Sequence, residues 1–160
     1  MNSRVAPTTA DDVVDAVLSA SRVLVAVAAR SLVDVADEVT LPQYRALVVL
    51  ASRGPQKVAG LAGHLGVAPA TATRMCDRLV RKRLITRTHE RGDRRRVRVE
   101  LSPRGRALVD EVSERRRVEI RELLRSVPSS SRDELVRALG LLRAAAGEVP
   151  EQSWSTGWDL

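Results

Sequence analysis

Two short helical segments joined by a glycine-containing turn restrict the fold more than any other feature of this chain. Residues 58–65 predict one helix, residues 66–69 a turn, and residues 69–83 a second helix. In the second helix small and apolar residues recur at three- and four-residue spacing, at Ala72, Met75, Cys76, Leu79 and Val80. The opposite side carries Ala70, Thr73, Arg74, Asp77, Arg78 and Arg81. This is the helix-turn-helix pattern, in which one face of the second helix is core and the other is free to enter a groove.

A β-hairpin is predicted directly after the second helix. Residues 85–89 and 95–101 flank a turn that contains Gly92 and Asp93. The second arm alternates strictly, with Val97, Val99 and Leu101 against Arg96, Arg98 and Glu100. Because successive side chains of a strand point to opposite faces, this period of two predicts one apolar row and one mostly cationic row. A helix-turn-helix followed by a basic hairpin is a winged helix.

The positive charge of the chain is concentrated in this region. The formal net charge is +7, yet residues 74–98 alone carry +8 and the remainder −1. Clustered cations predict a polyanionic partner, because each cation placed on a phosphate releases condensed counterions. The chain has no Phe, one Tyr and two Trp, and both Trp lie at the extreme C-terminus, so aromatic platforms on which unpaired bases stack are missing. We therefore expect double-stranded DNA as the partner.

Long helices are predicted on both sides of the winged helix. The first runs from Thr9 to about Asp37 and is apolar nearly all the way round between Val13 and Val27. More apolar surface than one small domain can cover predicts burial against a second subunit. Side-chain caps mark the helix starts, with capping boxes expected at Thr40–Gln43 and Ser131–Glu134, and single caps at Thr8 or Thr9 and at Ser102.

These elements together predict a mainly α protein: a winged helix-turn-helix with a small β-hairpin wing, and long N- and C-terminal helices that form a dimerisation region. We assign residues 1–160 to one such domain. Residues 9–38 and 103–147 hold the dimerisation helices, 40–102 the DNA-binding lobe and 148–160 a C-terminal tail. Trp154 and Trp158 of the tail cover a pocket or dock on the partner subunit, and a docked tail is favoured.

Several classes of function are not supported by the composition. The single cysteine, Cys76, excludes an intrachain disulfide and fits a reducing compartment, so we expect a cytoplasmic protein. Its place among apolar helix positions predicts a buried thiol and no redox switch. His64 and His89 are far apart and predict no metal site. No nucleophile is paired with a base, so neither an enzyme nor a cofactor is predicted. No apolar stretch is long enough to span a membrane.

The chain resembles the MarR family of bacterial transcriptional regulators over residues 13–146. The resemblance is densest at 65–74 and at 93–102, where an Asp, one residue, an Arg and alternating strand residues ending in Leu-Ser, with Gly105 nearby, form the wing signature. It implies that the first and last helices interlock across a two-fold axis, that residues 69–83 lie in the major groove, and that the wing, residues 89–96, reaches the minor groove. Lys57 and Ala68 depart from the family, because similar proteins have side-chain caps there, each worth about 1 kcal/mol.

The expected DNA-binding residues follow from these placements. They are Pro69, Ala70, Thr71, Thr73, Arg74, Arg78 and Arg81 on the helix, and Arg91, Asp93, Arg94, Arg95 and Arg96 in the wing. Arg74 and Arg78 sit one turn apart, which suits guanine edges or phosphates. Thr71 and Thr73 bind phosphate or serve as local caps. Asp93 is expected to orient Arg95, while Arg94 or Arg95 enters the narrow minor groove.

The predicted function is sequence-specific binding of a pseudo-palindromic operator by a homodimer, which most simply represses by blocking transcription. The alternative is an architectural protein that coats DNA without sequence preference. The resemblance also implies an effector, a small aromatic or lipophilic acid bound between the dimer and DNA-binding lobes, and no residue of this chain is assigned to such a ligand.

Overall fold

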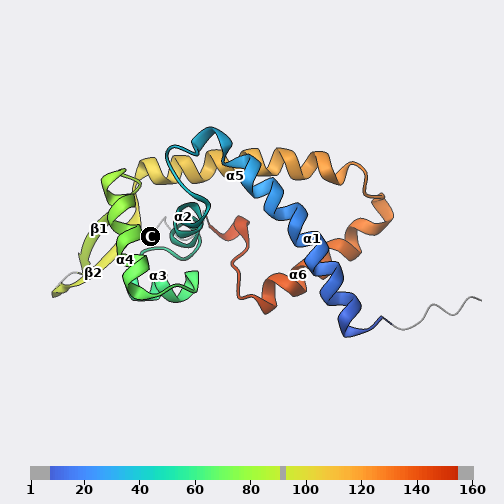
Figure 1. The fold of residues 1–160 in the computed structure, drawn as a ribbon, viewed down its shortest axis with the longest axis horizontal. Coiled ribbons are helices and arrows are strands. Elements are labelled where there is room, and N and C mark those ends of the chain that lie inside the picture. The colour runs from blue at the N-terminus through green and yellow to red at the C-terminus, as the bar shows by residue number, and fades with distance from the viewer. Residues whose placement is uncertain (1–7, 91–92, 155–160) are drawn as a thin grey trace, which may run out of the picture.

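The computed structural model describes residues 8–90 and 93–154. Within these ranges the chain forms six α-helices, three short 3-10 helices and one hairpin. The elements are α1 Ala10–Ser31, η1 Val33–Val35, α2 Leu41–Arg53, α3 Val58–Leu65, α4 Pro69–Arg81, β1 Ile85–Glu90, β2 Asp93–Leu101, α5 Pro103–Leu124, η2 Ser129–Ser131, α6 Arg132–Ala145 and η3 Glu151–Ser153. Figure 1 shows α2, α3, α4 and the hairpin as a lobe at one end of the long α5, with α1 and α6 extending away from that lobe. None of the described helices is long and apolar enough to cross a membrane.

The predicted mainly helical fold with a two-stranded wing is confirmed. The strands pair antiparallel from Ile85↔Leu101 to His89↔Val97, and the register shifts between His89 and Glu90. Residue Gln56, between α2 and α3, adds an unpredicted third strand position: its backbone exchanges two hydrogen bonds with Val99, at 2.9 and 2.8 Å. The sequence could not predict this pairing, because a single residue shows no alternation of apolar and polar side chains.

Most of the predicted caps are present. Thr9 and Asp12 form a capping box, with Thr9 Oγ1 accepting from Asp12 N at 3.2 Å. Thr40 and Gln43 form another, and Ser102 Oγ accepts from Gly105 N at 3.0 Å. The box predicted at Ser131–Glu134 is wrong, because Ser131 has helical backbone angles at the end of η2 and makes no side-chain cap. An N-cap needs extended backbone angles to aim its side chain at the first turn.

Three predicted helices end earlier than the sequence pattern indicated. α1 stops at Ser31 instead of continuing to about Asp37, and a 3-10 turn follows. The change of direction buries Leu32, Val35 and Val39 in the core, which a straight helix would have carried past it. α4 ends at Arg81 instead of Arg83, because Arg83 adopts a left-handed φ of 58°. α5 ends at Leu124 instead of about Val127.

The core lies in the lobe and fixes the orientation of α4. Its fully buried side chains come from α2, α3, α4, the connection after α4, the hairpin and the first half of α5. They include Leu47, Leu50, Leu61, Leu79, Leu84, Ile85, Val99, Val109 and Val112. Outside the lobe the chain is thinly packed. α1, α5 and α6 contribute exposed Val13, Val14, Val17, Leu18, Val23, Leu24, Val25, Val118, Leu123, Val136, Leu139, Leu141 and Leu142. α1 does contact α5, where Arg30 Nε lies 2.8 Å from Glu119 Oε2.

Candidate nucleic-acid interface

The turn between α3 and α4 holds the second helix against the lobe at a fixed angle. Gly66 ends α3 with a left-handed φ of 65°, which glycine adopts without steric cost. Pro69 then begins α4 with its ring presetting the first turn. Neither Lys57 nor Ala68 makes a side-chain cap, as their residue types predicted. Both helix starts therefore depend on packing, not on caps, for their position.

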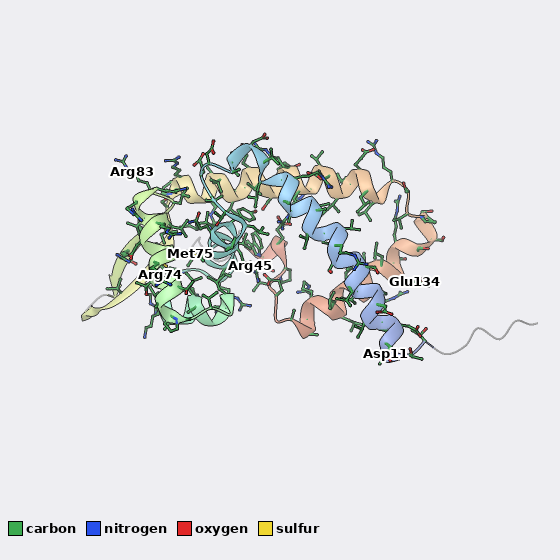
Figure 2. All side chains as sticks on the ribbon, viewed as in Figure 1. Asp11, Arg45, Arg74, Met75, Arg83 and Glu134 are labelled. Carbon is green, nitrogen blue, oxygen red and sulfur yellow. The ribbon has the colours of Figure 1, made fainter. Side chains whose placement is uncertain are left out.

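The two faces of α4 are separated as the sequence predicted. Ala72, Cys76 and Leu79 are fully buried. Thr71 is half-buried, and the other six expected DNA-binding residues on α4 are exposed, namely Pro69, Ala70, Thr73, Arg74, Arg78 and Arg81. Figure 2 shows Arg74 and Met75 on α4 where it borders the rest of the lobe. The structure thus brings the helical part of the predicted site together on one accessible surface.

The two threonines of α4 are already engaged locally. Thr73 Oγ1 donates to the carbonyl of Pro69 at 3.0 Å. Arg74 Nη2 donates to Thr71 Oγ1 at 3.4 Å, so the Thr71 hydroxyl proton is still available to a phosphate. Thr73 was expected either to bind phosphate or to bond locally. The geometry supports the local bond, since its single hydroxyl proton is used within the helix.

A shallow hollow of about 300 Å³ lies beside α4, against the start of α2. Arg74, Arg78, Thr71 and Met75 line one wall, and Thr40, Pro42 and Gln43 the other. The α2 residues were not among the expected site residues. Their link to α4 is tertiary, and the sequence signal at Thr40 and Gln43 is fully explained by the capping box that they form.

Some of the cations within residues 74–98 bind other parts of the protein instead of facing solvent alone. Arg87 of β1 makes an ion pair with Asp77 of α4, which ties the hairpin to the helix. Lys82 Nζ donates to the carbonyls of Asp37 and Glu38 after η1, at 3.2 Å for Asp37. Asp77 is consequently half-buried, although the helical pattern predicted an exposed position. The charge that faces outward is therefore smaller than the count over residues 74–98.

The structure describes the wing through the backbone of its two strands. β2 carries the predicted residues Asp93, Arg94, Arg95 and Arg96 out beyond the lobe, where β1 ends. Arg91 lies outside the described residues, and the side chains of residues 93–96 lie outside them too. The expected orientation of Arg95 by Asp93 therefore stays a prediction.

Cys76 is fully buried in the lobe, as predicted. Burial raises the pKa of its thiol, because the charged thiolate is disfavoured away from water. A protonated, inaccessible thiol is a poor nucleophile, so this residue packs as a small apolar side chain.

A second hollow, of about 660 Å³, lies between α2, α5, α6 and the segment after α6. Apolar walls come from Tyr44, Val48, Leu139, Val149 and Trp154, and cationic groups from Arg45, Arg116 and Arg143. Burial raises the pKa of Tyr44, whose hydroxyl lies 3.4 Å from Ser113 Oγ. Trp154 lines this hollow as the favoured docked tail predicted, while Trp158 lies outside the described residues.

Comparison with known proteins agrees with this arrangement. A model of the MarR family matches residues 39–97. The solved structure of RV1404 from Mycobacterium tuberculosis is 42% identical and superimposes with a TM-score of 0.79, covering 91% of this chain and 100% of that one. YsmB of Bacillus subtilis (strain 168), an HTH-type transcriptional regulator, is 32% identical over 88 residues, which are 55% of this chain and 60% of YsmB. The HTH-type transcriptional repressor MdtR of the same organism is 39% identical over 74 residues, or 46% of this chain and 48% of MdtR. The chain thus matches between about half and three fifths of the length of these two curated relatives.

Proposed function

The chain belongs to the MarR family of winged-helix transcriptional regulators, and from this premise we propose that it represses transcription in the bacterial cytoplasm as a homodimer bound to a pseudo-palindromic DNA site. It is a DNA-binding regulator and not an enzyme. The observation that carries the proposal is the exposed face of α4, with Arg74, Arg78 and Arg81, beside the basic hairpin. A helix held by its buried face, with cations outward, has the shape and charge that enter a major groove.

The dimeric state is supported by the apolar surface of α1, α5 and α6. Val14, Leu18, Leu24, Leu139 and Leu142 are each about half exposed. Soluble monomers rarely expose so many large apolar side chains on neighbouring helices. An isologous contact between two copies would bury them, on the order of 2,000 Å² or more in total. It would also place two α4 helices in a two-fold arrangement, which matches a pseudo-palindromic site.

Repression is a simpler mode of regulation than activation, because a dimer bound to the operator excludes other proteins from it. The curated name of MdtR, a repressor, supports the same direction. Release by a ligand is the finer part of the proposal. The hollow lined by Tyr44, Trp154 and Arg116 joins apolar walls to a cationic group, which suits a small aromatic acid.

Base reading by α4 is tested by Arg74→Ala and Arg78→Ala. If each guanidinium contacts a base edge, its loss should reduce discrimination at particular base pairs by about 1 to 3 kcal/mol. Loss of a phosphate contact would weaken binding equally on all sequences. Affinities for a panel of single-base operator variants separate these results, and Arg132→Ala, on α6, is the matched control. If both α4 variants bind as the wild type does, the exposed face of α4 does not lie in the major groove.

The wing is tested by Asp93→Ala together with Arg95→Ala. Both should weaken operator binding if Asp93 orients Arg95 toward the minor groove. The Asp93 result is diagnostic, because removing an acid ought to strengthen binding to a polyanion on charge alone. Each lost phosphate contact should also flatten the slope of log affinity against log salt by about 0.9, whereas loss of the orienting Asp should change the slope less. Tighter binding by folded Asp93→Ala would show that the wing acts only as a cationic arm.

A further inference from the structure

The segment 147–154 folds back from the end of α6 to the lobe, and we call it the strap. Gly147 has a left-handed φ of 63°. Its N–H donates to Ala144 O at 3.0 Å, and Glu148 N donates to Arg143 O at 3.1 Å. This pair of bonds is the Schellman motif, which ends a helix and turns the chain sharply. Figure 1 shows the strap returning from α6 to the side of α2.

The strap is held to α2 by paired charges. The Arg45 guanidinium donates twice to the Glu148 carboxylate, at 3.2 and 2.5 Å, in a bidentate arrangement. Arg53, at the end of the same helix, donates to the carbonyl of Gly147. Bidentate pairs fix direction as well as distance. The hydrogen bonds from Arg45 lower the pKa of Glu148, so the carboxylate stays charged at neutral pH. Figure 2 shows Arg45 on the part of the lobe nearest to the strap.

The far end of the strap is fixed by Trp154. Its ring packs against the core, and its Nε1–H donates to Val149 O at 3.3 Å. Glu151 lies 3.5 Å from the guanidinium of Arg117 on α5. The strap therefore contacts both α2, which belongs to the lobe, and α5, at whose end the lobe lies.

α6 has little other support within the described chain. It buries none of its own residues, and Val136, Leu139, Leu141 and Leu142 on it are exposed. In the proposed dimer these side chains pack on the second copy, so α6 moves with the partner. The strap then links α6, held by the partner, to α2 and to the lobe half of α5.

We propose that the strap sets the angle between the dimerisation helices and the DNA-binding lobe, with Glu148, Arg45 and Trp154 as positioning residues that do not touch DNA. The inference rests on the proposed dimeric DNA-binding function. If it holds, the strap determines the spacing of the two α4 helices, and thus which half-site separation the dimer accepts.

The first experiment uses full-length protein and the duplex that the wild type selects from a random library. Glu148→Arg and Arg45→Glu should each lower affinity for the complete duplex about tenfold and leave affinity for one half-site within twofold. The double variant Arg45→Glu/Glu148→Arg, which restores the opposite charges, should recover most of the loss. Glu122→Arg, which breaks an exposed Glu–Arg pair on α5 with an oxygen–nitrogen distance of 2.9 Å, is the control and should change neither affinity. Equal loss on both duplexes, or no loss on the complete one, would overturn the proposal.

A second measurement does not need DNA. Trp154 and Trp158 are the only tryptophans, so in a Trp158→Phe background the emission reports Trp154 alone. Glu148→Arg should move that emission to longer wavelength as the ring becomes hydrated, and the double charge-swapped variant should return it. If the emission does not respond to Glu148→Arg, the Glu148–Arg45 pair does not hold Trp154 in place and the proposal is overturned. If the wild type selects no duplex, the DNA-binding proposal fails while this test of the strap still stands.

Discussion

Gly105→Ala is expected to destabilise the protein by about 3 kcal/mol, the largest loss that we predict for adding one methyl group. A Cβ on Gly105 would lie 1.9 Å from Leu84 O and 2.9 Å from Leu84 C. Both are backbone atoms, so no side-chain rotation relieves the clash. Ser102 holds this contact closed, since its Oγ donates to Arg83 O at 2.6 Å and accepts from Gly105 N. The first turn of α5 would have to move away from the start of β1.

Thermal unfolding checks this expectation. For a chain of this length, a loss of that size should lower Tm by roughly 10 °C. Gly63→Ala is the matched control, because a Cβ there meets nothing within 4 Å and the residue lies in α3. That substitution should stabilise the helix by up to about 1 kcal/mol. Equal Tm values for the two variants would mean that α5 does not pack on residue 84 as closely as described.

Leu18→Asp is expected to convert the proposed dimer into monomers. Leu18 is 53% exposed on α1, among the apolar side chains that we assign to the interface. In a two-fold dimer every substitution occurs twice. The change removes two buried leucines and buries two unpaired carboxylates, which together should raise the dimer Kd by at least about 1,000-fold, or ~4 kcal/mol.

Sedimentation at micromolar concentration provides the readout. The wild type should sediment at twice the mass of one chain and Leu18→Asp at the mass of one. Val33→Asp, an exposed valine outside the three apolar helices, should remain dimeric. The monomeric variant should also lose cooperative binding to the complete operator. A wild type that sediments as a monomer would refute the dimer and the pseudo-palindromic site inferred from it.

Local sequence patterns were sufficient for the elements that form the candidate DNA-binding face. The spacing of Ala72, Cys76 and Leu79 predicted the buried side of α4, and burial of all three confirms it. The caps at Thr40 and Ser102 were also predicted correctly, and Thr9 is one of the two residues expected to cap α1. In each case the interacting groups lie within a few residues of one another, so that propensity and periodicity contain the information.

Contacts between distant segments were not predicted. The pairing of Gln56 with Val99, the ion pair of Asp77 with Arg87 and the bonds of Arg45 to Glu148 each join elements whose meeting depends on the packed lobe. The early end of α1 at Ser31 has the same origin, because burial of Leu32 and Val35 overrides a helical pattern that continues past them. The candidate site therefore followed from sequence on α4, whereas its supports on α2 and β1 did not.

The direct test of the central claim is a map of where the protein protects DNA. Purified full-length protein is added to genomic fragments at physiological salt, and the protected segments are sequenced. We predict short, discrete footprints, each containing two related half-sites separated by about one or two helical turns, as expected for a dimer with one α4 helix in each of two major grooves. Continuous protection that spreads with protein concentration and has no common sequence would contradict this account and identify a DNA-coating protein instead.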